Sequence, residues 1–142
     1  QWQTVMQTNV NAVFMLNQGL FDLLDQGDPS CIVHVSSSVG LQGRAYWGAY
    51  SASKFALEGL NQILADETET AGKIRVYSVN PGGTRTAMRR EAYPLEDPQT
   101  LPIPERHMSV FLFLLAGSLV PNLIKHPLPA TGAQLDARSW LS

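Results

Sequence analysis

Apolar segments of two different periods alternate along this chain, and this alternation limits the possible folds. Between Trp2 and Leu24 the apolar residues recur at three- and four-residue spacing, which is typical of an amphipathic helix. Cys31–Val35 is a short continuous apolar run, as expected of a buried strand. Strands that alternate with helices need crossover connections, which favour a parallel sheet covered by helices. The sequence therefore predicts an α/β fold with a parallel sheet.

The remaining elements follow in the same alternating order. We expect helices over residues 2–24, 49–68 and 105–119, and strands over residues 31–36, 74–79 and 133–136. The first helix should end near Gly27, because glycine suits a helix C-cap and Pro29 prevents continuation. Segment 84–104 is polar and rich in proline, with one short helix expected at 86–92. We expect this segment to be a substrate lid.

Composition indicates a single domain that acts on small molecules. The 142 residues are 44% hydrophobic, which is ordinary for one globular domain. The net charge of -2, without a basic stripe, predicts no nucleic-acid partner. The apolar stretch Val110–Val120 is shorter than the roughly 20 residues that span a bilayer, so we expect no membrane partner. Cys31, the only cysteine, reads as a small strand hydrophobe and fits a reducing, cytoplasmic compartment.

Tyr50 and Lys54 form the strongest candidate for a reaction centre. Their i, i+4 spacing puts both side chains on one face of the expected helix. A neighbouring ammonium favours the phenolate, so we expect Lys54 to lower the pKa of Tyr50 from about 10. A tyrosine of that kind can exchange a proton with a carbonyl or alcohol oxygen.

Two further segments should meet at the same edge of the sheet. Ser37 follows the first strand, and the turn Pro81–Gly82 follows the second. Ligands of parallel α/β sheets bind beyond the carboxyl ends of the strands. We therefore expect both segments to face one ligand.

These motifs resemble those of the short-chain dehydrogenase/reductase family. Thr8–Phe14 looks like the family's asparagine motif, Val35–Gly40 like its serine motif, and Tyr50–Lys54 like its Tyr-x-x-x-Lys pair, followed by the Pro-Gly turn. The resemblance covers nearly the whole chain and implies a one-domain, Rossmann-like, three-layer fold. Within the family, the likeness is to a bacterial branch of YciK-type oxidoreductases and oxoacyl-(acyl-carrier-protein) reductases.

The resemblance implies a role for four residues in the reaction. Tyr50 would give or take the proton at the substrate oxygen, and Ser37 would orient the carbonyl. Lys54 would bind the ribose hydroxyls of the cofactor and lower the pKa of Tyr50. Asn9 would support a water that connects Lys54 to solvent. The substrate would be an alcohol or ketone, with 3-oxoacyl compounds as one candidate.

The same resemblance implies NAD(P) as the cofactor. Tyr50 and Lys54 would contact it, together with the turn Pro81–Gly82. Thr84 would lie near the nicotinamide carboxamide, and Thr86 near the carboxamide or the pyrophosphate. The family usually has Ile or Val at the position of Thr84. The sequence leaves the choice between NAD and NADP open.

No Gly-rich strand-to-helix turn that could hold a pyrophosphate occurs in these residues. We therefore expect residues 1–142 to be the C-terminal part of a single Rossmann-like domain whose Gly-rich cofactor half is absent. The complete protein would be the oxidoreductase, and this chain alone would be inactive. The alternative is a noncatalytic fragment that serves as an oligomerisation or interaction module. By resemblance, the helices 2–24 and 50–68 would form a homodimer or homotetramer.

Several site assignments have competing interpretations. Ser36 and Ser38 compete with Ser37 for the catalytic hydroxyl, although the spacing to Tyr50 favours Ser37. Asn11 competes with Asn9, which the register to the following Phe favours. A serine hydrolase is disfavoured, because no Gly-x-Ser-x-Gly elbow occurs.

The histidines and the arginines of segment 84–104 can also be explained by structural roles. His34 lies in an apolar strand and is better explained as a core histidine than as a base. His107 and His126 lack neighbours at metal-ligand spacing, so we predict no metal site. Arg85, Arg89 and Arg90 would either recognise an acidic group of the substrate or form a solvated helix face, and the solvated face is favoured.

Overall fold

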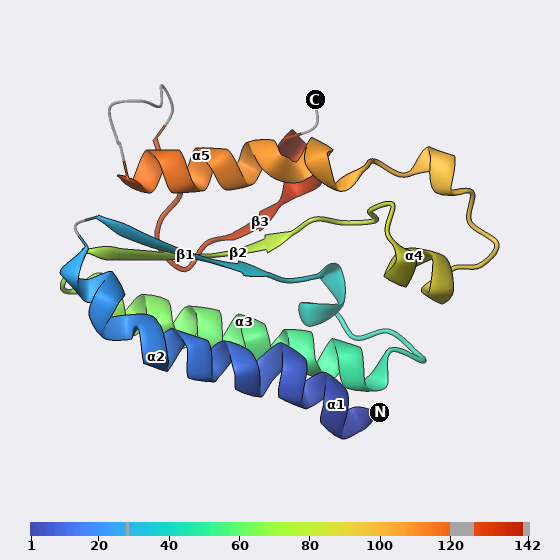
Figure 1. Cartoon of the computed structure of the whole chain (residues 1–142), viewed down its shortest axis with the longest axis horizontal. Coiled ribbons are helices and arrows are strands. Elements are labelled where there is room, and N and C mark those ends of the chain that lie inside the picture. The colour runs from blue at the N-terminus through green and yellow to red at the C-terminus, as the bar shows by residue number, and fades with distance from the viewer. Residues whose placement is uncertain (28, 120–126, 141–142) are drawn as a thin grey trace.

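The computed structural model describes residues 1–27, 29–119 and 127–140. An N-terminal helical segment is followed by three strands that alternate with helices (Figure 1). In chain order the elements are α1 (Trp2–Met6), a π-helical turn (Gln7–Asn11), α2 (Ala12–Gln26), β1 (Ser30–Val35), α3 (Gly48–Glu69), β2 (Ile74–Asn80), α4 (Ala87–Ala92), α5 (Met108–Leu119) and β3 (Gln134–Asp136). The predicted order of helices and strands is confirmed.

The three strands form one parallel sheet in the order β1-β2-β3. Ser30 pairs with Ile74 and Val35 with Val79, so β1 and β2 lie in register over their whole common length. Helices α2 and α3 cover one face of the sheet and α5 covers the other (Figure 1). The prediction of a Rossmann-like fold with a parallel sheet between helical layers is confirmed.

Two apolar clusters hold the three layers together. On the face of α2 and α3, Leu64 and Ala65 pack with Ile74 and Val76 of β2. On the opposite face, Tyr77 and Val79 of β2 pack with residues of α5. Alternate residues of a strand point to opposite faces, and β2 has buried residues on both, so it lies between the two helical layers.

The N-terminal helix contains a local departure from the predicted regular helix over 2–24. Residues Gln7–Asn11 form a π-helical turn between α1 and α2, and the helix continues to Gln26. A π-turn shifts the helical register by one residue and is often found at functional sites. Asn9 lies within this turn, and its side-chain amide donates a hydrogen bond to Ser53 of α3. The π-helical turn therefore coincides with a contact to α3, which the periodicity of the sequence could not predict.

The segment between β2 and α5 folds back on itself. The backbone N-H of Arg85 donates to the carbonyl oxygen of Pro102, which ties the two ends of the segment together. The short helix predicted at 86–92 is confirmed as α4. The helix predicted from 105 begins instead with a 3-10 turn, Pro104–His107, and becomes α-helical at Met108. No helix in the described ranges is both long and apolar enough to cross a bilayer.

Candidate active site

A cavity of ≈ 400 Å³ lies where β1 and β2 end beside the first turns of α3. The residues around it come from α3, the π-turn, the segment after β1 and the segment after β2. All eight site residues named from the sequence line it: Asn9, Ser37, Tyr50, Lys54, Pro81, Gly82, Thr84 and Thr86. The expected meeting of the two strand ends with the Tyr50 helix is therefore observed.

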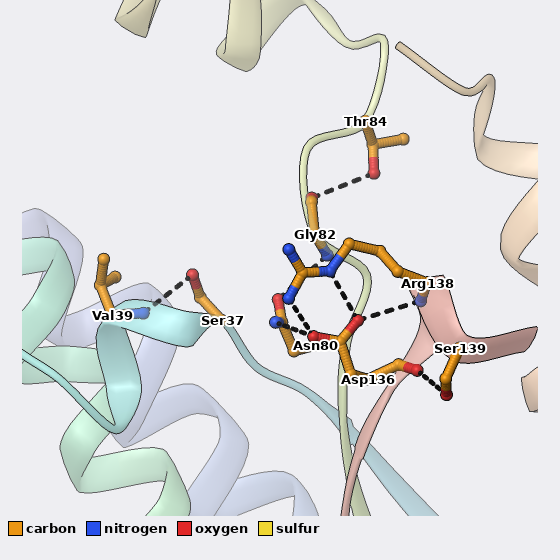
Figure 2. A network of polar contacts seen from close by, with 8 residues as sticks. All are labelled: Ser37, Val39, Asn80, Gly82, Thr84, Asp136, Arg138 and Ser139. Atoms are coloured by element: carbon orange, nitrogen blue, oxygen red, sulfur yellow. Dashed lines mark hydrogen bonds and ion pairs between the residues drawn. The ribbon is translucent and has the colours of Figure 1, made fainter.

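Ser37 takes up an extended conformation just after β1 and caps the following 3-10 turn. Its side-chain oxygen accepts a hydrogen bond from the Val39 N-H at 3.4 Å (Figure 2). Ser37 also shares a side-chain hydrogen bond with Tyr50. Ser36 lines the same cavity, but its hydroxyl is buried and has no partner among the described residues. Of these two serines, Ser37 is therefore the one in contact with the Tyr50 side chain.

Tyr50 and Lys54 lie one turn apart on α3, as their spacing predicts. The Lys54 Nζ atom is 5.5 Å from the centroid of the Tyr50 ring. It donates a hydrogen bond of 2.9 Å to the carbonyl oxygen of Val35, the last residue of β1. The ammonium is therefore held between α3 and the end of the strand.

The pKa of Tyr50 differs from the sequence-based expectation. Burial raises the pKa of the Tyr50 phenol, while its hydrogen bond with Ser37 opposes that rise. Burial lowers the pKa of Lys54, against the influence of the Glu58 carboxylate. The expected depression of the Tyr50 pKa by Lys54 is wrong for this structure, because removal of the phenol from water dominates.

Asn9 is joined to the Tyr50 backbone through Ser53. The Asn9 Nδ2 atom donates to the Ser53 hydroxyl at 3.1 Å, and that hydroxyl donates to the carbonyl oxygen of Tyr50 at 2.7 Å. Asn11, the competing asparagine, is exposed and donates to Gln7 on its own helix. Of the two asparagines, Asn9 is the one that lines the cavity.

The turn after β2 is braced by the end of β3. Asn80 accepts a hydrogen bond from the Gly82 N-H at 3.0 Å and donates one to Asp136 at 3.2 Å (Figure 2). Arg138 forms an ion pair with Asp136, and its Nε donates to that carboxylate at 2.8 Å. Gly82 has φ +72°, and a Cβ atom there would lie 2.8 Å from the Arg138 Cδ atom. The positive φ therefore favours glycine, and an added Cβ would force the Arg138 side chain to shift.

The two threonines of this segment have different surroundings. The Thr84 hydroxyl lies 3.0 Å from the buried imidazole Nε2 of His107. Thr86 caps α4 by accepting a hydrogen bond from the Arg89 N-H at 3.1 Å. The partnership with His107 could not be read from the sequence, because 23 residues separate the pair.

The comparisons with known proteins agree with these motifs. The family model for short chain dehydrogenases matches residues 1–97. This chain belongs to the short-chain dehydrogenase family. The uncharacterized oxidoreductase YciK of Escherichia coli K12 is 58% identical over 114 residues, which are 80% of this chain and 44% of YciK.

Solved structures of other short-chain dehydrogenases match almost the whole chain. The structure of the E. coli oxidoreductase yciK has 51% sequence identity and a TM-score of 0.84, and the match covers 96% of this chain and 52% of that one. A short chain dehydrogenase of E. coli CFT073, solved in complex with NADPH, has 51% identity and a TM-score of 0.85. That match covers 96% of this chain and 53% of that one. The chain thus spans about half the length of the relatives it matches.

Sequence reasoning did not place one wall of the cavity, although it named Arg89 as a possible contact for an acidic group of the substrate. The wall consists of Trp47, Met88, Arg89 and Ala92. Trp47 precedes α3, and the other three residues belong to α4. A signal was present in the Trp-x-x-Tyr spacing and in the Met88/Ala92 pair, four residues apart on a short helix.

Two of the three arginines in segment 84–104 form internal contacts, contrary to the favoured interpretation as a solvated face, whereas the third is exposed. Arg85 donates to the carbonyl oxygens of Leu101 and Gln99. Arg89 forms a two-pronged ion pair with Glu96, with N–O distances of 2.6 and 2.7 Å. Arg90 is exposed and does not line the cavity.

Two buried polar side chains that do not line the cavity have hydrogen-bond partners on neighbouring elements. His34 lies between Asn17 and Asn61, at 3.0 Å from each, and burial lowers the pKa of its imidazole. His34 therefore has partners on both ring nitrogens, as a core histidine should. Glu58 accepts hydrogen bonds from the side chains of Ser78 and Gln134, at 2.8 and 2.6 Å.

The sequence predicts no metal site in this chain. Among the described residues, no group of three or more His, Cys, Asp or Glu side chains is placed to hold a metal ion. His126, one of the histidines considered, lies outside the described residues.

Proposed function

We propose that the protein to which this chain belongs is an NAD(P)-dependent oxidoreductase that interconverts an alcohol and a ketone. The observation that carries the proposal is the single cavity shared by Ser37, Tyr50 and Lys54 with the turn after β2. Its polar groups suit a reaction at a carbonyl oxygen, and family membership supports the same chemistry. The relative solved with NADPH makes NADPH the first cofactor to test.

The residues present fit the nicotinamide and ribose end of such a cofactor. Lys54 would bind the ribose hydroxyls, and the hydroxyls of Thr84 and Thr86 would contact the carboxamide end. Pro81 and Gly82 of the turn line the same cavity and would lie against the cofactor. The bound cofactor supplies or accepts the hydride.

The protein's part in ketone reduction is to orient the carbonyl and to deliver one proton. Ser37 would donate a hydrogen bond to the carbonyl oxygen and hold it beside Tyr50. The raised pKa keeps the Tyr50 phenol protonated at neutral pH, so it can donate its proton to that oxygen. Asn9 and Ser53 would fix the start of α3, and the proposed water at Asn9 would return a proton through Lys54.

The direct test is spectrophotometric. The full-length protein is mixed with NADPH or NADH and a panel of ketones, and cofactor oxidation is followed by its absorbance. Oxidation that depends on both ketone and protein supports the proposal. Failure with every member of a panel that spans aliphatic, cyclic and 3-oxoacyl compounds would count against it.

A second candidate function is an oligomerisation module without catalysis. Helices α2 and α3 carry exposed apolar residues, among them Leu16, Leu23 and Ile63, and a groove of ≈ 530 Å³ runs between the two helices. An exposed apolar surface of this kind favours association. We propose that these helices form a homodimer or homotetramer in the active enzyme as well. Light scattering together with an NADPH titration distinguishes an active oligomer from an inactive one.

We also propose a cytoplasmic location for the protein. The thiol of Cys31 is free and half-buried in β1, and burial raises its pKa. A free thiol is compatible with a reducing compartment. Fractionation of cells with an antibody against the protein would test this location.

A further inference from the structure

The wall of the cavity on the side of α4 is largely apolar. Met88 and Ala92 lie four residues apart on α4, and both line the cavity together with Trp47. The Met88 side chain is 59% exposed, so much of its surface is available to a ligand. Methionine adapts its shape to a partner and makes favourable contacts with aromatic rings.

A chain of aromatic contacts connects this wall to the reacting tyrosine. The Trp47 ring centroid lies 5.5 Å from that of Tyr50 and 5.9 Å from that of Tyr93. These distances are typical of aromatic pairs, which are rigid and bury a large apolar area. Trp47 therefore extends an aromatic surface from the proton donor toward the lid.

The one cation of the wall is already paired. Arg89 donates through two nitrogens to the Glu96 carboxylate, and its Cζ atom lies 3.6 Å from the centroid of the Tyr93 ring. The edge of the guanidinium that could bind a carboxylate is thus occupied by Glu96. One face of the guanidinium is covered by the Tyr93 ring. Binding an acidic substrate there would require the Glu96 pair to break.

No other charged group near the cavity takes the place of Arg89 as a free cation among the described residues. Arg85 donates to backbone carbonyls of the lid, and Arg90 does not line the cavity. Lys54 lines it, but the proposed function assigns its charge to the cofactor. The substrate side of the cavity therefore offers aromatic and thioether surface without an unpaired positive charge among the described residues.

From this arrangement, and resting on the proposed function, we propose that the substrate is a neutral, ring-bearing ketone or secondary alcohol. Its oxygen contacts Ser37 and Tyr50, and its ring packs against Trp47 and Met88. Ketones with a carboxylate on the ring are disfavoured, since the wall has no free cation to compensate the loss of hydration.

A matched pair of ketones tests this substrate class. The full-length protein is assayed with NADPH and either α-tetralone or α-tetralone carrying a carboxylate on its aromatic ring. We expect kcat/KM to be at least roughly tenfold higher for α-tetralone, the range that one wall of an apolar pocket can supply. Equal or better use of the carboxylated ketone would overturn the proposal.

A pair of variants tests the assigned wall. Met88→Ala should lower kcat/KM for α-tetralone roughly tenfold and affect butanone, which has no ring to pack against Met88, much less. Leu95→Ala is the matched control, because Leu95 also belongs to the lid but is 100% exposed and does not line the cavity. An unchanged response of Met88→Ala to α-tetralone would also overturn the proposal.

The two proposals fail in different ways. Tyr50-dependent reduction of ketones without any preference for the neutral ring would overturn the substrate class alone. If no ketone is reduced, the proposed function fails, and calorimetric titration of both tetralones into the wild type and Met88→Ala still tests the wall. Equal affinities in that titration would overturn the substrate class as well.

Discussion

The Lys54 ammonium lies 5.5 Å from the centre of the Tyr50 ring and is hydrogen-bonded to the Val35 carbonyl oxygen. The lysine is therefore anchored to the end of β1 beside the Tyr50 ring. Burial is the largest influence on the pKa of both groups. It raises the pKa of Tyr50 and lowers that of Lys54. Each shift favours the neutral form of the side chain.

The raised pKa of Tyr50 predicts opposite pH profiles for the two directions of the reaction. Ketone reduction needs the protonated phenol, so its kcat/KM should be constant near neutral pH and fall as pH rises through the Tyr50 pKa. Alcohol oxidation needs the phenolate, so its kcat/KM should rise over the same range. Initial rates across the pH range check this. A reduction rate that increases with pH would contradict the assignment.

Glu58→Gln should lower the stability of the protein and make the charged form of Lys54 less favourable. The variant disturbs the two hydrogen bonds that Glu58 accepts from Ser78 and Gln134, at a cost of about 1–3 kcal/mol. Glu58 also favours the charged form of Lys54, so its removal should lower the Lys54 pKa further and increase KM for the cofactor. Urea unfolding and cofactor kinetics measure the two effects.

Glu67→Gln is the matched control for that experiment. Glu67 lies on the same helix but is exposed, so its substitution should change stability little. Equal stability of the two variants would mean that the buried carboxylate of Glu58 contributes nothing.

Gly82→Ala should distort the turn after β2. Alanine at φ +72° costs about 1–2 kcal/mol, and the contact with Arg138 adds to that cost. Gly59→Ala is the control, because Gly59 lies inside α3 with no atom within 4 Å of an added Cβ, and alanine there should stabilise. Denaturant midpoints for both variants give the comparison. A denaturant midpoint of Gly82→Ala equal to that of the wild type would show that the conformation of this turn does not depend on glycine at position 82.

Thr84→Val should destabilise the contact between the cavity and the 3-10 turn Pro104–His107, which precedes α5. The substitution removes the hydrogen bond to the buried His107, whose other ring nitrogen has no partner among the described residues. Leaving such a group unpaired costs about 1–3 kcal/mol. Thr70→Val, at the exposed end of α3, serves as the control. Thermal unfolding that is the same for both variants would show that the Thr84 contact is not stabilising.

The fold could be predicted because its strands and helices have clear periodicity. The apolar run of β1 and the spacing along α3 were sufficient to predict these two elements. The alternation of strands with helices predicted that the strands would form a parallel sheet. The π-turn at Gln7–Asn11 could not be predicted, because its sequence is compatible with a regular helix. Its distinguishing feature is a contact between Asn9 and Ser53, which are 44 residues apart.

The site was predictable where its residues follow strand ends or share a helix face. Its supports were not, because they depend on distant partners such as Asn80 and Asp136, which are 56 residues apart. The direction of the Tyr50 pKa shift depends on burial, which the Tyr-x-x-x-Lys spacing alone does not specify. The cavity wall formed by Trp47 and α4 could not be placed from the sequence, because the position of α4 depends on the fold of segment 84–104, including the ion pair between Arg89 and Glu96.

The most direct measurement of the central claim is turnover by Tyr50→Phe in the full-length protein. Loss of the only proposed proton donor should reduce kcat by a factor on the order of 100 to 10,000, while the Kd for NADPH stays within a few-fold of the wild type. Tyr46→Phe is the control, because Tyr46 is fully exposed and does not line the cavity, and its turnover should be normal. Near-normal turnover by Tyr50→Phe would contradict the assignment of Tyr50 as the proton donor.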